Sequence, residues 1–129
     1  SGGHDIPAGD VLDIHVYPGP GAPHPTDGRA GVLGEFGGLG LPIKGHMWVD
    51  SSWGYSGMKD PADLTSQYAD LLRKAYGLKD SAGLNAVIYT QTTDVETECN
   101  GLMTYDREII KPDVKVAADA NKGKFTAKP

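Results

Sequence analysis

Two short apolar runs near the start of the chain have the period of a β-strand. In residues 11–17, Leu12 and every second residue after it are apolar, which predicts a strand with one buried face. Residues 31–36 form a second apolar run, which carries Glu35 and is followed by the Gly37-Gly38 pair. Parallel α/β sheets keep their reactive groups at the carboxyl ends of strands, so Glu35 is a candidate reactive group. The alternative is a buried strand followed by an ordinary turn.

Further along, the pattern predicts one helix and a third strand. Asp60 is a suitable N-cap and Pro61 suits the first helical position, so an amphipathic helix should span roughly Pro61 to Tyr76 and close at Gly77. Residues 84–91 then form a buried type of strand, and strand, helix and strand in succession indicate a right-handed crossover. The weaker expectations are a short helix or extended chain at 103–110, a weak helix at 112–121 and a loose segment at 122–129.

Length and charge narrow the class of protein. With 129 residues the chain has room for a single domain, residues 1–129, and it shows neither a repeat nor an interdomain linker. A net charge of −5 argues against a nucleic-acid or anionic-membrane partner and favours a neutral ligand. We expect neither a signal peptide nor a membrane span in this sequence, which we interpret as a piece of a longer protein. The localisation stays undetermined.

Several chemistries do not fit the spacing of the reactive residues. The glycine-rich stretch 34–40 does not accommodate a nucleotide-binding fingerprint. Cys99 is the only cysteine, which excludes an internal disulfide, and it lacks an obvious neighbouring base. The histidines are far apart in the sequence, so we expect no metal site and no cofactor. These are His4, His15, His24 and His46.

The remaining chemistry is that of carboxylates with aromatic neighbours, and it suits a sugar. Glycosidic bonds are cleaved by two carboxyl groups, and Glu35 is a plausible member of such a pair. Tyr17 ends the preceding strand, so in a parallel sheet its phenol should reach Glu35 and orient it. The long segment 41–59 contains Trp48 and Trp53, which could stack on sugar faces. The alternative is that both tryptophans fill the top of the core.

Four segments of the chain together resemble family 2 glycoside hydrolases, which include β-galactosidases, β-mannosidases and β-glucuronidases. The segments are 13–18 (DIHVYP), 33–38 (LGEFGG), 89–96 (YTQTTDVE) and 100–107 (NGLMTYDR). The resemblance implies an α/β fold, specifically a partial (β/α)8 (TIM) barrel comprising strands six to eight with their helices. It also implies that Glu35 is the catalytic nucleophile of a retaining enzyme and Tyr17 its hydrogen-bonding partner. The candidate substrate-binding residues are His15, His46, Trp48, Trp53 and Gln91.

One departure from the family pattern is large. The family's acid/base residue is a glutamate in an Asn-Glu pair, and this sequence contains no such pair. We expect Asp94 and Glu96 to organise a loop, with Arg107 as a candidate partner, rather than to replace the missing acid. The isolated chain should therefore have little activity.

Two alternatives stay open at the level of sequence. One is a noncatalytic carbohydrate-binding module that uses Trp48 and Trp53 for stacking, and the other is a structural α/β domain with a coincidental motif. For a fragment of a barrel, three strands with only one or two helices leave two open sheet edges and an uncovered apolar face, so we expect the chain to associate with itself.

Overall fold

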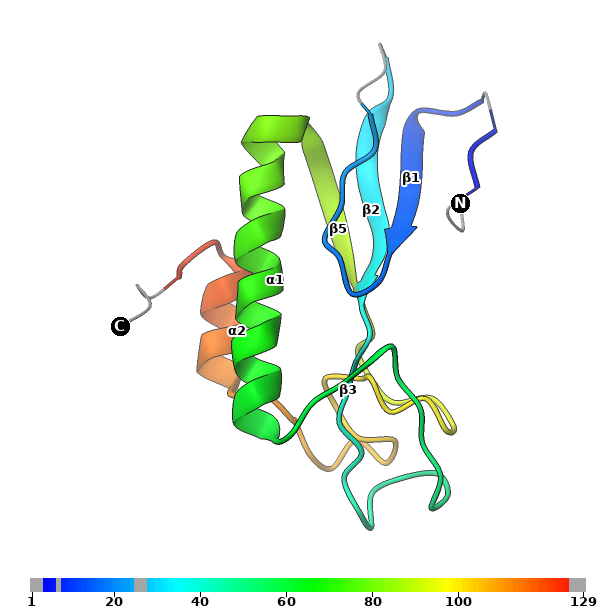
Figure 1. Ribbon diagram of the computed structural model, residues 1–129, viewed down its shortest axis with the longest axis vertical. Helices are drawn as coiled ribbons and strands as arrows, with labels where there is room; N and C mark the ends of the chain where they lie inside the picture. The colour runs from blue at the N-terminus through cyan, green and yellow to red at the C-terminus, as the bar shows by residue number, and fades with distance from the viewer. Residues whose placement is uncertain (1–3, 7, 25–27, 126–129) are drawn as a thin grey trace.

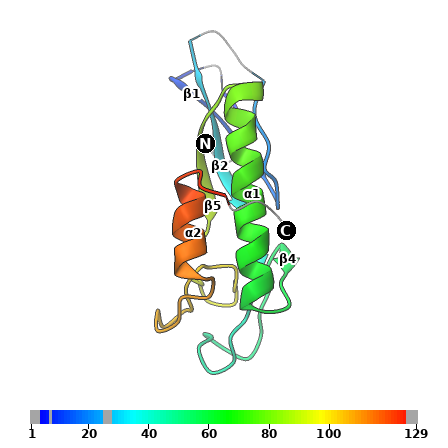
Figure 2. The ribbon, with the colours of Figure 1, turned by 90° about the vertical axis from the view of Figure 1, so that its left-hand side faces the viewer.

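A parallel sheet and a pair of helices form the two layers of the computed structural model, which describes residues 4–6, 8–24 and 28–125 (Figure 1). The sheet has the order β1-β2-β5, and β3 pairs with β4 in a separate two-stranded sheet. Both helices cover the same face of the three-stranded sheet and lie side by side (Figure 2). The bounds are β1 Val11–Val16, β2 Ala30–Gly37, β3 Leu39–Gly40, β4 Ser56–Gly57, α1 Pro61–Ala82, β5 Leu84–Thr90 and α2 Val114–Asn121.

The expectation of a partial (β/α)8 barrel is wrong for this structure. The described residues form a three-stranded parallel sheet, a two-stranded sheet and two helices, and strand–helix units do not alternate along the chain. Residues 18–23 connect β1 towards β2 without a helix. Three of these six residues are proline, which removes backbone donors and restricts the residue before it. The fold is a small α/β arrangement instead.

Helix α1 begins where the sequence predicts and ends later. The Asp60 carboxylate accepts the Asp63 N–H at 2.8 Å, which caps the first turn, and Pro61 occupies the next position. The predicted end at Gly77 is wrong, because the helix runs to Ala82. Gly83 then adopts the left-handed conformation (φ 68°), and its N–H reaches the Leu78 carbonyl. Residues 78–82 continue the helix, and the next glycine, Gly83, lies directly before β5.

The core lies between the helices and one face of the sheet. Ile14, Leu33 and Val87 are register partners on neighbouring strands and share this face. Leu33 and Phe36 are fully buried. The other face carries Ile88, which is 58% exposed. The core residues are Leu33, Phe36, Leu39, Leu41, Leu64, Tyr68, Leu71, Leu72, Leu84 and Ala120.

The remaining segments match the predictions in part. Helix α2 is present, with the Asp113 carboxylate accepting the Val116 N–H at 2.9 Å. Segment 103–110 forms turns and isolated bridges rather than a helix. The predicted loose segment falls outside the described residues beyond position 125, and no prediction anticipated β3 and β4.

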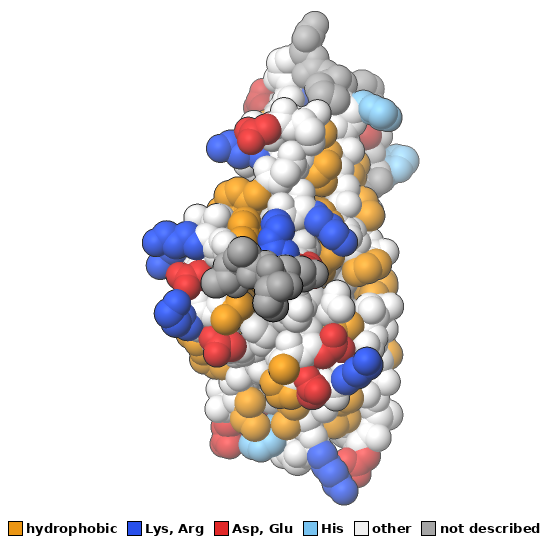
Figure 3. Space-filling view, turned by 60° about the vertical axis from the view of Figure 1, so that its left-hand side comes forward, with side chains coloured by type: hydrophobic (Ala, Val, Ile, Leu, Met, Phe, Trp, Pro, Cys, Tyr) orange, Lys and Arg blue, Asp and Glu red, His pale blue; other side chains and the backbone are white. Residues whose placement is uncertain are grey.

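The surface over the helices mixes acidic, basic and apolar side chains (Figure 3). Neither described helix combines the length and the apolar character that crossing a membrane requires.

Candidate active site

Glu35 lies near the carboxyl end of β2, and two side chains of the neighbouring strand region contact it. The Tyr17 hydroxyl donates a hydrogen bond to Glu35 Oε2 at 2.5 Å, so the predicted contact between the two strand ends is present. His15 Nδ1 lies 3.3 Å from the same oxygen. The Glu35 side chain is 43% exposed, which leaves the carboxylate accessible to a ligand.

Tyr17 is held in its protonated form. Burial raises the pKa of its phenol well above the ordinary value, and the hydrogen bond to Glu35 raises it further. Tyr17 is therefore a donor at neutral pH.

A β-bulge at Gly34 brings His15 and Glu35 opposite each other. Ile14 pairs with Leu33, and the next pair is His15 with Glu35, so Gly34 is the extra residue. The Gly34 N–H donates to Asp13 Oδ1 at 2.8 Å, which ties the two strands at the bulge.

Asp13 also approaches His15. Asp13 Oδ2 lies 3.2 Å from His15 Nε2, so both nitrogens of the His15 ring have a carboxylate neighbour. A Cβ at Gly34 would lie 2.2 Å from Asp13 Oδ1, so a larger residue there would displace the Asp13 carboxylate. His15, predicted to bind substrate, thus sits between two acids in the sheet. In this position it can orient Glu35.

An aromatic cluster, made up of Tyr17, Trp53 and Tyr55, extends from the Glu35 contact. The rings of Tyr17 and Tyr55 are stacked with centroids 3.8 Å apart, and Trp53 meets Tyr55 edge to face at 5.5 Å. Trp53 and Tyr55 are 48% and 52% exposed, respectively. Tyr55 belongs to the aromatic-rich segment 41–59, which was the only signal for it in the sequence.

The glycine pair 37–38 makes room for aromatic rings at the end of β2. Gly37 and Gly38 both have positive φ angles, 97° and 63°. A Cβ at Gly38 would lie 2.5 Å from the Tyr55 ring and 3.0 Å from the Tyr17 ring. Gly38 therefore allows the backbone to pass directly beneath the rings of Tyr17 and Tyr55, whereas Gly37 makes room for the Tyr89 ring.

Trp48 and His46 contact a different loop. Trp48 is 52% exposed and meets Tyr105 edge to face at 5.0 Å, so the alternative that both tryptophans fill the core is wrong. His46 Nδ1 lies 2.7 Å from Asp106 Oδ2 and 3.9 Å from Glu108 Oε2.

His46, Asp106 and Glu108 are also the residues that could approach a metal ion. Within the described ranges their ligand atoms lie within 4.8 Å of one another, a grouping that linear spacing did not reveal. His46 Nδ1 and Asp106 Oδ2 contact each other directly, and the Glu108 side chain is 72% exposed. We interpret this group as a polar link between segment 41–59 and the loop at 104–109.

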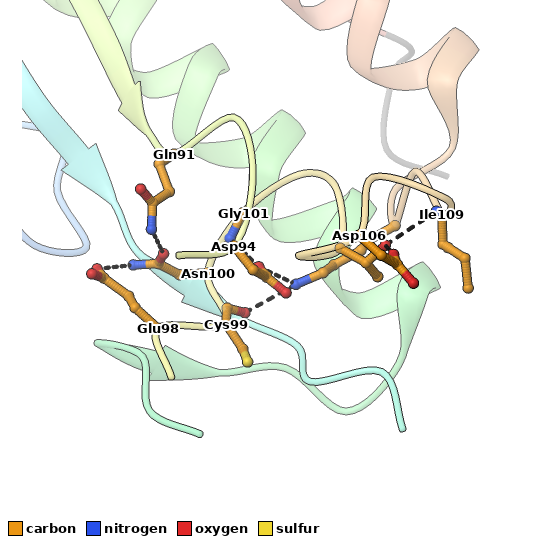
Figure 4. Close-up of polar contacts among 10 residues, drawn as sticks. Gln91, Asp94, Glu98, Cys99, Asn100, Gly101, Asp106 and Ile109 are labelled. Carbon is orange, nitrogen blue, oxygen red and sulfur yellow. Dashed lines mark hydrogen bonds and ion pairs between the residues drawn. The ribbon is translucent and has the colours of Figure 1, made fainter. Parts of the chain in front are cut away.

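Gln91 begins a polar network beyond the end of β5 (Figure 4). Its side-chain amide donates to Asn100 Oδ1 at 2.8 Å, and Asn100 Nδ2 donates to Glu98 Oε1 at 2.8 Å. Asn100 is fully buried. Gln91 thus supports Asn100 and, through it, Glu98. The sequence indicates Asn100 only as part of a turn, and it gives no indication of a role for Glu98.

Asp94 organises the same loop, as predicted, but with a different partner. Asp94 Oδ1 accepts the Gly101 N–H at 2.8 Å and the Lys111 ammonium at 2.6 Å, and both charged side chains are completely buried (Figure 4). The suggested partner Arg107 is exposed instead and has a φ of 62°. Glu96 is exposed on the turn before Glu98.

The site is therefore an accessible carboxylate oriented by a phenol and a histidine, beside exposed aromatic rings. In comparisons with known proteins, no family model matches the chain and no curated protein sequence matches it.

Proposed function

We propose that Glu35 is the nucleophile of a retaining β-glycosidase of the family 2 type. In the first step its carboxylate attacks the anomeric carbon of the sugar, and the bond to the leaving-group oxygen breaks as that oxygen takes a proton from an acid. Water then hydrolyses the glycosyl ester and regenerates Glu35.

The observation that carries this proposal is the Tyr17–Glu35 hydrogen bond on an exposed carboxylate. The described contacts of Tyr17 and His15 both go to Oε2, which leaves Oε1 for bond formation. The hydrogen bond from the phenol fixes the direction of the carboxylate, as a nucleophile in a displacement requires. The exposed rings of Trp53 and Tyr55 offer apolar faces suited to the faces of a pyranose.

The second carboxyl group of the reaction is not assigned to this chain. A retaining mechanism places it about 5–5.5 Å from the nucleophile. Asp94 is buried against Lys111 and Asp13 is engaged by Gly34 and His15, so neither is a free proton donor. We therefore propose that the isolated chain turns over natural glycosides slowly or not at all.

A fluorosugar labelling experiment tests Glu35 separately from the missing acid. In a 2-deoxy-2-fluoro-β-glycosyl fluoride the leaving group departs without protonation, so the glycosyl ester can form and accumulate. Mass spectrometry of the labelled chain should place the sugar on Glu35. Glu35→Gln should abolish labelling, and Glu96→Gln, on an exposed turn, should not. A label on another residue, or equal labelling of Glu35→Gln, contradicts the assignment.

A noncatalytic carbohydrate-binding module is the second candidate, and the exposed Trp53–Tyr55 pair favours it. In that case methyl β-glycosides should show saturation-transfer contacts with these rings, and Glu35→Gln should weaken binding only modestly. The fluorosugar should then leave the chain unlabelled. Trp48 lies with Tyr105 in a separate pair, so Trp48→Ala should leave this binding intact.

A further inference from the structure

Glu98 has a fixed direction, because a buried amide holds one of its oxygens. The Asn100 carbonyl oxygen accepts from Gln91, so the Asn100 nitrogen must face Glu98, to which it donates at 2.8 Å (Figure 4). Asn100 is fully buried, whereas Glu98 is partly exposed. This arrangement orients a carboxylate that can still reach a ligand.

The backbone places Glu98 beside the aromatic cluster. Glu98 forms a parallel bridge with Trp53, supported by hydrogen bonds from the Trp53 N–H to Thr97 O at 2.8 Å and from the Cys99 N–H to Trp53 O at 2.9 Å. Trp53 in turn contacts Tyr55, whose ring stacks on Tyr17. Glu98 is therefore joined through its backbone to one end of the aromatic cluster, whose other end, Tyr17, contacts Glu35.

The ends of the strands tie the two carboxylates to one rim of the sheet. The Gly38 N–H donates to Thr90 O at 2.9 Å, which joins the end of β2 to the end of β5. The Gln91 N–H then donates to Asn100 O at 3.3 Å, which attaches the loop that carries Glu98. Backbone hydrogen bonds thus connect the loop that carries Glu98 to the strand that carries Glu35.

The charges around this rim are acidic. In the part of the chain that the structure describes, Glu35 contacts Tyr17 and His15, and Glu98 contacts Asn100. None of these partners is a lysine or an arginine, the residues that bind carboxylate ligands. Lys111, in the same loop region as Glu98, is buried in its pair with Asp94. A ligand at this rim meets hydrogen-bond acceptors and negative charge.

We propose that Glu98 accepts a hydrogen bond from a hydroxyl group of the bound sugar and makes the site select neutral β-glycosides over uronic acid glycosides. The inference rests on the proposed function. A sugar hydroxyl donates to the oriented Glu98 carboxylate, whereas a ligand carboxylate at the rim is repelled by Glu98 and Glu35. Gln91 and Asn100 are positioning residues that act through Glu98.

Matched pairs of methyl β-glycosides test this selectivity in the full chain. The probes are methyl β-D-galactopyranoside with its uronic acid counterpart, and methyl β-D-glucopyranoside with its uronic acid counterpart. Binding is measured by calorimetry at neutral pH and low salt. For at least one pair, the neutral sugar should bind about tenfold more tightly than the uronide. Glu98→Gln should reduce this ratio to about threefold or less, and Glu96→Gln should leave it unchanged.

A salt titration of the unmodified chain provides a second measurement that does not depend on the folding of a variant. Added salt screens the repulsion, so the ratio should fall as ionic strength rises. A preference for uronides, or a ratio that responds equally to Glu96→Gln and Glu98→Gln, overturns the inference. If the fluorosugar labels Glu35 but Glu98→Gln leaves the affinity ratio unchanged, only the inference fails. If the chain neither binds these sugars nor is labelled, the proposed function fails as well.

Discussion

At the scale of single residues, the orientation of Glu35 depends on Tyr17. The phenol donates at 2.5 Å to one carboxylate oxygen, and its own pKa is raised by burial, so the donor keeps its proton at neutral pH. Its ring also stacks on Tyr55, which links the nucleophile candidate to the aromatic cluster. One side chain therefore connects the proposed chemistry with the proposed sugar-binding surface.

Tyr17→Phe removes the hydrogen bond and keeps the stacked ring. Hydrogen bonds to charged groups contribute about 1.5–3 kcal/mol, so fluorosugar labelling of Glu35 should slow by about 10- to 100-fold. The rate of mass increase measures the effect. Tyr105→Phe is the control, because Tyr105 pairs with Trp48. Equal rates for both variants would show that Tyr17 does not orient the nucleophile.

Asp106 shows how a short loop sets the charge of one residue. The hydrogen bond from the Thr104 hydroxyl, followed by the Glu108 N–H and His46, lowers the pKa of Asp106 from 3.8 to about 2. A depressed pKa in the folded state stabilises the protein above the unfolded value and ceases to do so as the pH falls towards the folded value. This contribution should therefore disappear between about pH 4 and pH 2.

Thr104→Val should raise the pKa of Asp106 towards 3.8, because the main hydrogen bond to its carboxylate is lost while the shape of the buried side chain is retained. Carbon-detected NMR titration of the Asp106 carboxyl group measures this pKa. Thr97→Val, in a different loop, serves as the control. An unchanged pKa in Thr104→Val would assign the shift to His46 and the backbone instead.

At the scale of elements, a buried ion pair holds the loop that follows β5. Asp94 accepts from Lys111 and from the Gly101 backbone, and Lys111 also donates to the Cys99 carbonyl at 3.1 Å. Two segments that lie seventeen residues apart are thereby joined inside the protein. The loop that carries Glu98 and Asn100 depends on this link for its shape.

Lys111→Met leaves the Asp94 carboxylate buried without its cation. Breaking a buried pair on one side costs about 3–5 kcal/mol, so the free energy of unfolding should drop by that amount in urea denaturation. The double variant Asp94→Asn with Lys111→Met should recover part of the loss, because no uncompensated charge remains. A loss below about 1 kcal/mol for Lys111→Met would mean that water reaches Asp94.

At the scale of the whole molecule, the two faces of the sheet differ. The helices cover one face (Figure 1), whereas the other carries Ile88, which is 58% exposed. In the three-stranded sheet of the described structure, β1 and β5 are edge strands. We propose that copies of the chain associate through these open edges and the adjoining uncovered face.

Ile88→Lys should weaken this association, since a charge on the uncovered face is costly to bury. Sedimentation velocity of the unmodified chain should show oligomers, and the variant should shift towards monomer. Ile110→Lys is a matched control, because Ile110 is 53% exposed but lies in the loop region. A monomeric unmodified chain, or an equal shift in both variants, contradicts the proposal.

The local elements follow from the sequence because their causes are local. Alternating apolar residues place β1, the Asp60 cap starts α1, and strand ends in a parallel sheet bring Tyr17 to Glu35. The predicted end of α1 at Gly77 is wrong because this glycine stays helical, and Gly83 provides the left-handed cap instead. The barrel expectation came from a resemblance rather than from these local causes, and the structure shows a small two-layer arrangement instead.

By itself the sequence determined the three strands of the parallel sheet, the start of the long helix and the pairing of Tyr17 with Glu35. Only the tertiary structure decided that Tyr55 stacks on Tyr17, that Asn100 orients Glu98 and that Lys111 is the partner of Asp94. These contacts involve loops, whose sequences show no periodic pattern. Their residues meet through the packing of the whole chain, which their spacing in the sequence does not predict. The site therefore combines a nucleophile candidate that pattern revealed with surroundings that only packing determines.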